Sequence, residues 1–265
     1  MLLHLINYMN YKTHQGVTLP VLGIGSWEGN WGRDEIRNDP IKDKICKEAI
    51  VYAIQNGMTH IDTAELYGSG RSEIIIGEAI NNFDRNKLFI TSKVKGQNLH
   101  YDDVIKSCKD SIERLQTPYL DLYLIHWPNS EIPIKETMQA LDYLVDNDLV
   151  KRIGVSNFSV EQMIEAQEYT KYKLLTNQVH YNFSERNNAS HVKNVESEIL
   201  PYCQNNDMFL MAYKPLALGK ITEKMSAPEA LKWLIEKPNV IAIFGSTNPN
   251  HIKENINLIV DSSSL

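Results

Sequence analysis

The sequence predicts an α/β fold, a (β/α)8 TIM barrel with an N-terminal β-hairpin closing the bottom. Short strands that are apolar on both faces alternate eight times with amphipathic helices. Such strands are typical of a parallel sheet that is buried on both sides. The chain has 265 residues, a length at which α/β barrels commonly form one domain. Eight such units in one chain fit a closed barrel.

The first elements are the hairpin and a short strand. Residues 13–20 contain Gly16 between two short extended stretches, which indicates a hairpin with this glycine in its turn. Residues 21–25 form the first barrel strand. Residues 28–39 have the composition of a loop, and a helix then begins near Lys42.

The later units repeat the same alternation. Apolar residues recur at helical spacing between the strands, and Ser159 with Gln162 forms a capping box at one helix start. A break is expected near Pro201. The later strands are expected at 59–62, 88–93, 120–126, 150–155, 174–180, 208–213 and 240–244. The helices are expected at 42–55, 72–82, 101–115, 134–145, 160–169, 191–204, 228–237 and 249–259.

An open doubly wound sheet is the alternative fold. It is less favoured because no Gly-x-Gly-x-x-Gly motif leads from the first strand into a helix, and a long loop follows Gly25 instead. Nothing in the composition marks a linker. Residues 1–265 are therefore expected to form one domain, with 1–9 as a loose N-terminal extension.

The composition limits the partners. It is 43% hydrophobic and 23% charged with a net charge of −6, and it has no basic patch that would favour nucleic acid. No apolar run approaches the roughly 18 residues of a membrane span. Three widely separated cysteines fit reduced thiols, so a cytoplasmic location is expected. We expect a monomer or a weak homo-oligomer that acts on a small molecule.

Ionisable residues stand where three successive strands end. Asp62, Lys93 and His126 are 31 to 33 residues apart, about one βα unit. Because parallel strands of a barrel end at one rim, these side chains should converge there, with Tyr67 reaching over from the loop after Asp62. Taken singly, each has an ordinary structural explanation, such as a cap, a surface charge or loop packing. Their joint occurrence at this spacing favours a site.

The chemistry of this group follows from proximity. A phenol with a pKa near 10 donates a proton poorly at neutral pH. A nearby ammonium should lower that pKa, and a carboxylate should hold the ammonium in place. A histidine beside the phenol can donate a hydrogen bond to a carbonyl oxygen. The four residues should therefore protonate an oxyanion as it forms. No serine or cysteine is placed as a nucleophile, and no metal-ligand spacing is present.

The chain resembles the aldo-keto reductases from about residue 18 to residue 255. The resemblance rests on motifs that follow one another in order. They are Leu22-Gly-Ile-Gly-Ser-Trp, His60-Ile-Asp-Thr-Ala-Glu-Leu-Tyr-Gly, Ile90-Thr-Ser-Lys, Asp121-Leu-Tyr-Leu-Ile-His-Trp-Pro, Ile153-Gly-Val-Ser-Asn-Phe, Asn177-Gln-Val, Ala212-Tyr-Lys-Pro-Leu and Ile243-Phe-Gly-Ser-Thr-Asn. The resemblance implies reduction of aldehydes or ketones by NADPH, with Asp62, Tyr67, Lys93 and His126 as the catalytic tetrad and Tyr67 as the general acid.

The resemblance also implies a binding role for further residues. Ser156, Asn157 and Gln178 would hydrogen-bond the nicotinamide carboxamide, and Tyr213 would stack on its ring. Trp27 and Trp127 would line the substrate mouth. The remaining contacts expected along the cofactor, with Asp62 among them, are Gly25, Leu216, Gly245, Ser246, Thr247, Asn248, His251, Glu254 and Asn255.

Two departures from the family pattern change the expectations. Many relatives have a lysine at Gly245 and an arginine at His251, both serving the adenosine 2′-phosphate. Their absence predicts NADPH as the main cofactor with relaxed selectivity against NADH. The segment after the last helix is also short, as is the segment between Tyr213 and Pro228. Both predict an open pocket that is weakly selective for substrate.

Three other functions stay open from the sequence. The same residues would serve an NAD(P)-dependent alcohol or sugar dehydrogenase. A non-enzymatic regulatory subunit that binds NADP(H) is a second alternative. The third is a barrel that binds a phosphorylated metabolite at the N-terminus of its last helix, without hydride chemistry.

Overall fold

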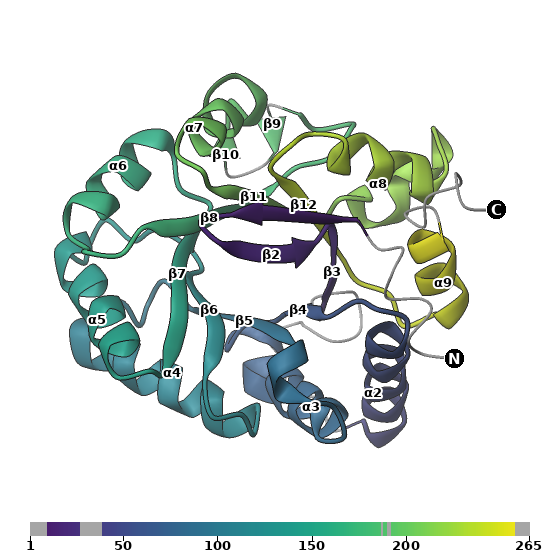
Figure 1. Cartoon of the computed structure of the whole chain (residues 1–265), viewed down its shortest axis with the longest axis horizontal. Helices are drawn as coiled ribbons and strands as arrows, with labels where there is room; N and C mark the ends of the chain where they lie inside the picture. The colour runs from purple at the N-terminus through teal and green to yellow at the C-terminus, as the bar shows by residue number, and fades with distance from the viewer. Residues whose placement is uncertain (1–9, 27–38, 187, 190–191, 258–265) are drawn as a thin grey trace.

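The computed structural model describes residues 10–26, 39–186, 188–189 and 192–257. In chain order, the barrel strands are β3 (Leu22–Gly25), β4 (His60–Asp62), β5 (Phe89–Val94), β6 (Leu120–Ile125), β7 (Val150–Ser156), β8 (Leu174–His180), β11 (Phe209–Tyr213) and β12 (Val240–Phe244). They pair in parallel in the order β11-β12-β3-β4-β5-β6-β7-β8, and β8 pairs with β11 to close the barrel (Figure 1). The predicted barrel is confirmed.

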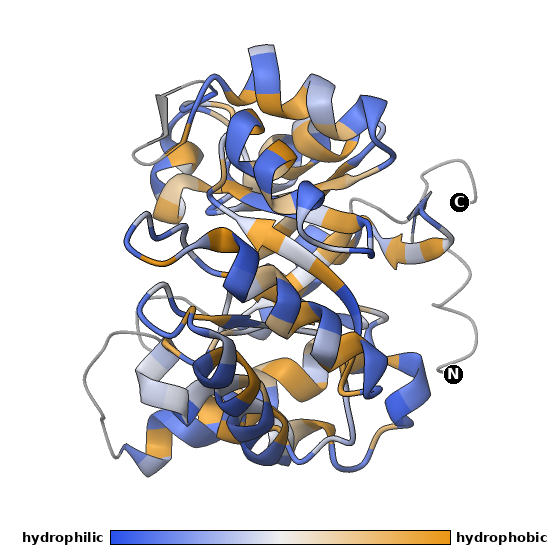
Figure 2. Ribbon diagram, turned by 90° about the vertical axis from the view of Figure 1, so that its left-hand side faces the viewer, coloured by the Kyte–Doolittle hydropathy of each residue, from blue (hydrophilic) through white to orange (hydrophobic). Residues whose placement is uncertain are grey.

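Helices surround the strands on the outside of the barrel (Figure 1). They are α2 (Pro40–Gln55), α3 (Arg71–Ile80), α4 (Tyr101–Arg114), α5 (Ile134–Asp146), α6 (Val160–Glu168), α7 (Leu200–Asn205), α8 (Ala227–Ile235) and α9 (Pro249–Asn257). The capping box of Ser159 and Gln162 is present at the start of α6. Figure 2 shows apolar and hydrophilic residues mixed along these helices, as expected for elements with one buried face.

The hairpin of β1 (Tyr11–His14) and β2 (Val17–Pro20) lies across the end of the barrel where the strands begin (Figure 1). Gly16 in its turn has a φ of 72°, a left-handed conformation that glycine adopts easily. Leu19 is only 1% exposed and packs with residues that fill the barrel interior. The interior cluster consists of Leu19, Leu122, Leu124, Leu175, Phe209, Met211, Ile241 and Ile243. The hairpin therefore closes the bottom of the barrel, as predicted.

The helix expected at 191–204 is different in the structure. A short β-hairpin of β9 (Asn188–Ala189) and β10 (Val192–Lys193) comes first. A π-helical turn, η4 (Val195–Ile199), then leads into α7, and Asn194 before it has a left-handed φ of 59°. Pro201 lies in the first turn of α7, where its missing N–H is not needed.

The expected N-terminal extension, 1–9, and most of the expected loop, 28–39, lie outside the described residues. Within the described part of the chain, none of the helices combines the length and the apolar character that crossing a membrane requires.

Candidate active site

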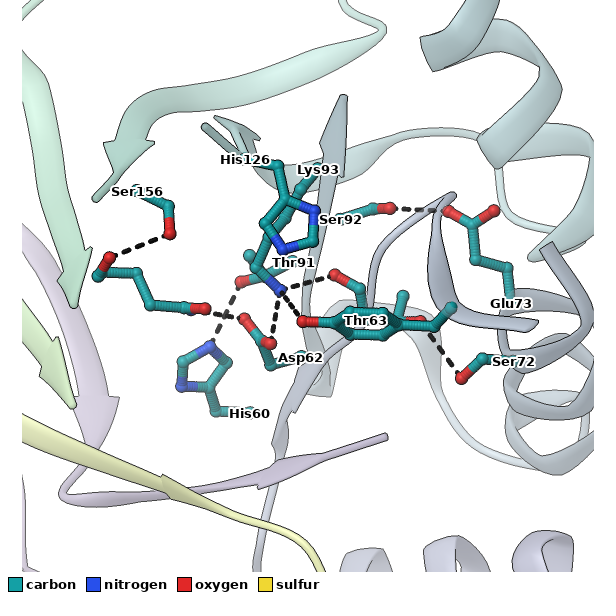
Figure 3. Close-up of polar contacts among 12 residues, drawn as sticks. His60, Asp62, Thr63, Ser72, Glu73, Thr91, Ser92, Lys93, His126 and Ser156 are labelled. Carbon is teal, nitrogen blue, oxygen red and sulfur yellow. Dashed lines mark hydrogen bonds and ion pairs between the residues drawn. The ribbon is translucent and has the colours of Figure 1, made fainter. Parts of the chain in front are cut away.

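The four ionisable residues predicted to converge do so at the carboxyl ends of three neighbouring strands. Asp62 ends β4, Lys93 lies near the end of β5, and His126 directly follows β6. Tyr67 begins the short helical turn η2 (Tyr67–Gly70), which follows β4. All four are buried, with exposed fractions between 0% for Lys93 and 9% for Tyr67. Figure 3 shows Asp62, Lys93 and His126 pointing toward a common centre.

The ammonium of Lys93 is at the centre of the group. Its Nζ donates to Asp62 Oδ1 at 2.6 Å, to the backbone oxygen of Thr63 at 2.8 Å and to the Tyr67 hydroxyl oxygen at 3.5 Å. An ammonium has three N–H donors, so all of them are used. Asp62 therefore fixes the ammonium next to the phenol, as predicted from the strand spacing.

The pKa of Tyr67 differs in direction from the prediction. Burial raises it well above its ordinary value, and the negative charge of Asp62 raises it further. The expectation that this pKa lies below its ordinary value is therefore wrong for the structure, because desolvation of the phenolate is the largest effect. Burial also lowers the pKa of Lys93, and the ion pair with Asp62 opposes that change.

His126 lies against the phenol and is neutral at physiological pH. Its ring meets the Tyr67 ring edge to face, with centroids 5.6 Å apart, and stacks on Trp127 at 6.2 Å. Burial, followed by the positive charge of Lys93, lowers the pKa of His126 to about 3. A neutral imidazole carries one N–H, which can donate to a ligand oxygen.

The residues predicted for the carboxamide form a hydrogen-bonded chain across the same mouth. Gln178 Nε2 donates to Asp62 Oδ2 at 2.7 Å, so this carboxylate is held from two sides. The Ser156 hydroxyl donates to the backbone oxygen of Gln178 at 2.9 Å. The Tyr213 hydroxyl donates to Asn157 Oδ1 at 2.9 Å. The four residues are thus placed together, next to Asp62.

A cavity of about 170 Å³ opens beside this network. Its lining combines three of the four tetrad residues and the predicted carboxamide residues with three residues that were not predicted for the site, Leu66, Lys214 and Ile243. Leu66 directly precedes Tyr67 and Lys214 directly follows Tyr213, whereas Ile243 lies two residues before Gly245, near the end of β12; these positions could have identified them. The full lining is Gly25, Asp62, Leu66, Tyr67, His126, Trp127, Ser156, Asn157, Gln178, Tyr213, Lys214, Ile243 and Gly245. Lys93 lies outside this set.

Among the described residues, none of the remaining predicted residues lines the cavity. Trp27 lies outside the described residues. Leu216 is half-buried and packs against the core. Asn248 and Ser246 precede α9, where the Ser246 hydroxyl accepts from the Asn248 N–H at 3.1 Å and Asn248 Oδ1 accepts from the Asn250 N–H at 2.9 Å. The others are Thr247, half-buried, and His251, Glu254 and Asn255, which lie on α9.

On α9, His251 and Glu254 are exposed, whereas Asn255 is 2% exposed. Its Oδ1 accepts no hydrogen bond from the described residues. A buried amide oxygen without a donor is uncommon in folded proteins. No group of three His, Cys, Asp or Glu side chains within 10–26, 39–186, 188–189 and 192–257 could hold a metal ion.

Comparison with known proteins assigns this arrangement to a family. The family model described as "Aldo/keto reductase family" matches residues 21–230. A methylglyoxal reductase of Escherichia coli (strain K12) is 33% identical over 257 residues, which cover 90% of this chain and 85% of that protein. A thermostable aldo-keto reductase solved with the inhibitor epalrestat has a TM-score of 0.85 and 38% identity, and 94% of each chain is covered. An aldo-keto reductase of Klebsiella pneumoniae solved with NADPH has a TM-score of 0.81 and 29% identity, covering 95% of this chain and 90% of that one.

Proposed function

The chain belongs to the aldo/keto reductase family, and from this premise we propose that it reduces aldehydes and ketones to alcohols with NADPH, with Tyr67 as the proton donor. The observation that carries the proposal is the position of the Tyr67 hydroxyl. It lies 3.5 Å from Lys93 Nζ and beside the neutral His126 ring, at the wall of the cavity. A phenol in this place can reach the oxygen of a carbonyl that enters the cavity.

Three residues of the tetrad then act on the substrate or on the phenol, and Asp62 holds Lys93 in place. His126 donates its N–H to the carbonyl oxygen and orients it. NADPH supplies a hydride to the carbonyl carbon when bound. As negative charge develops on the oxygen, Tyr67 gives it the hydroxyl proton, and the ammonium of Lys93 stabilises the phenolate that remains. A proton from solvent then restores the phenol.

The raised pKa of Tyr67 is compatible with this role. It keeps the phenol protonated across physiological pH, so the proton is present when the substrate binds. An alkoxide is a far stronger base than a phenolate, so proton transfer from Tyr67 is favourable once hydride has been added. Lys93, held charged by Asp62, then limits the cost of the buried phenolate.

The residues present fit the cofactor. Ser156, Asn157 and Gln178 would hold the carboxamide. One face of the Tyr213 ring is covered by His180, with centroids 5.5 Å apart, while Tyr213 itself lines the cavity. A flat heterocycle in the cavity would therefore meet the Tyr213 ring. Asn255 on α9 would lie near the adenine, as the resemblance implies.

The residues expected near the adenosine of the cofactor support a weak preference for NADPH over NADH. Among the residues expected there, neither Gly245 nor His251 supplies a permanent cation. Two backbone N–H groups near the start of α9, those of Asn248 and Asn250, already donate to the side chains of Ser246 and Asn248. With these two N–H groups engaged and no permanent cation at positions 245 and 251, we expect NADPH to be preferred only modestly over NADH.

The substrate class follows from the site and from one relative. A similar Escherichia coli protein is named a methylglyoxal reductase. The cavity wall includes the apolar and aromatic side chains of Leu66, Trp127 and Ile243. These side chains provide few polar groups that could recognise one particular substrate. We propose small aldehydes and α-oxoaldehydes as substrates, taken with broad and weak selectivity.

The test is an NADPH-oxidation screen over aldehydes, ketones, sugars and methylglyoxal, with wild type and Tyr67→Phe in parallel. We expect high KM values for several small aldehydes. Tyr67→Phe should lose turnover by about 10²-fold or more and keep NADPH binding, measured by quenching of tryptophan fluorescence. Turnover that survives in Tyr67→Phe would contradict the proton-donor role. Binding without turnover in the wild type would instead favour a regulatory subunit.

A further inference from the structure

The loop that carries Tyr67 has an unfavourable backbone. Gly68, Ser69 and Gly70 follow one another in the left-handed region, with φ values of 55°, 51° and 88°. Glycine tolerates this region, but at Ser69 it costs about 1 kcal/mol. A loop with this backbone needs contacts from outside to hold one conformation. The position of the Tyr67 hydroxyl depends on them.

Arg114, in the last turn of α4, provides such a contact. A Cβ atom placed on Gly70 would lie 2.7 Å from both Cδ and Nε of Arg114. The side chain of Arg114 therefore packs directly against the backbone of the Tyr67 loop. The same guanidinium donates to Glu73 Oε2 at 2.7 Å and to Ser111 Oγ at 3.3 Å, which fixes its course.

Glu73 connects this loop to the strand of Lys93. It lies in the first turn of α3, immediately after the loop, and its side chain is fully buried. Its second oxygen accepts a hydrogen bond of 2.6 Å from the hydroxyl of Ser92, the residue before Lys93 on β5 (Figure 3). One carboxylate thus joins α3, α4 and β5 behind the site.

We propose that Glu73 and Arg114 are positioning residues that set the distance between the Tyr67 hydroxyl and the Lys93 ammonium. This inference rests on the proposed function, since it assigns their effect to proton transfer from Tyr67. A buried carboxylate that loses one partner is costly, so the ion pair and the Ser92 hydrogen bond act as one unit. Neither Glu73 nor Arg114 lines the cavity.

A second ion pair, between Arg85 and Asp121 of β6, contacts the start of β5 and offers a matched control. Asp121 accepts 2.7 Å and 2.8 Å hydrogen bonds from Arg85 Nη2 and from the N–H of Ile90, at the start of β5. It resembles the Glu73 pair in chemistry but lies at the other end of the strand from Lys93. Glu73→Gln and Asp121→Asn each replace a carboxylate by an amide of similar shape.

The experiment measures kcat, KM and NADPH affinity for Glu73→Gln, Asp121→Asn and Tyr67→Phe, with melting temperatures. Glu73→Gln should lower kcat by about 10- to 100-fold, because a displacement of about 1 Å at the reacting group can have this effect. Its NADPH affinity should stay within about twofold of wild type. Deuterated NADPH should show a larger isotope effect on kcat, since the chemical step becomes slower. Asp121→Asn should change stability but neither kcat nor the isotope effect.

Arg114 supplies a milder test if Glu73→Gln folds poorly. Arg114→Lys keeps a cation opposite Glu73 and should retain more of kcat than Arg114→Gln. Equal kcat in Glu73→Gln and Asp121→Asn, with Tyr67→Phe inactive, would overturn the inference and leave the proposed function intact. Turnover that survives in Tyr67→Phe would overturn both.

Discussion

His60 and His126 are buried residues whose ring nitrogens bind protons differently in the folded and the unfolded chain. Burial lowers the pKa of His60 to about 4, and the charge of Lys93 lowers it further while Asp62 opposes this. The ring Nε2 of His60 lies 3.1 Å from the hydroxyl of Thr91. A histidine that folds in its neutral form makes stability depend on pH.

The expected consequence is loss of stability in mild acid. Between pH 6.5, the ordinary pKa, and about 4, the unfolded chain binds protons at His60 that the folded chain does not. The free energy of unfolding therefore falls as the pH falls through this range, by about 2 kcal/mol per such histidine at pH 5. Urea unfolding at pH 7.5 and pH 5 measures this difference.

His60→Gln removes one titrating ring and should shrink that pH-dependent difference by about 2 kcal/mol. His100→Gln, at a histidine whose side chain is 56% exposed, is the control and should leave the difference near the wild-type value. An unchanged difference in His60→Gln would show that this histidine is not held neutral by burial.

Among the elements, the N-terminal hairpin does more than cover the barrel. Lys12 on β1 donates from Nζ to the backbone oxygens of Ile235, Lys237 and Val240 at 2.5 to 2.6 Å. These oxygens lie at the end of α8 and the start of β12, where a helix end leaves carbonyl groups without partners. Burial lowers the pKa of Lys12 to about 8, so its ammonium is charged at neutral pH.

Lys12→Met should therefore lower the free energy of unfolding at pH 7 by about 2 kcal/mol, because buried carbonyl groups lose a charged donor. Lys44→Met, whose side chain is 76% exposed, should change it by less than about 0.5 kcal/mol. Urea unfolding of both variants measures this. Equal effects of the two would mean that the hairpin does not support the end of α8.

For the whole molecule, the strand ends and the pairing of Asp62 with Lys93 were predictable, and the contacts across the barrel were not. The apolar strands and the spacing of Asp62, Lys93 and His126 place these side chains on one rim. The contact of Gln178 with Asp62 spans 116 residues, and only the closed barrel brings the two together. The direction of the pKa shift at Tyr67 depends on burial, which the order of residues does not contain. The helix predicted at 191–204 starts later because Asn194 has a left-handed backbone, whereas the expected break near Pro201 matches the change from the π-helical turn to α7 at residues 199–200.

The cofactor would extend across the molecule, from the barrel mouth to α9. His251 lies exposed in the first turns of α9, where an arginine could reach a 2′-phosphate. Because NADH lacks this phosphate, His251→Arg should raise kcat/KM for NADPH by about fivefold and leave NADH unchanged. Steady-state kinetics with both cofactors measures the ratio, and His251→Gln is the uncharged control. A gain shared equally by NADPH and NADH would show that residue 251 does not face the 2′-phosphate, and the relaxed selectivity would then need another cause.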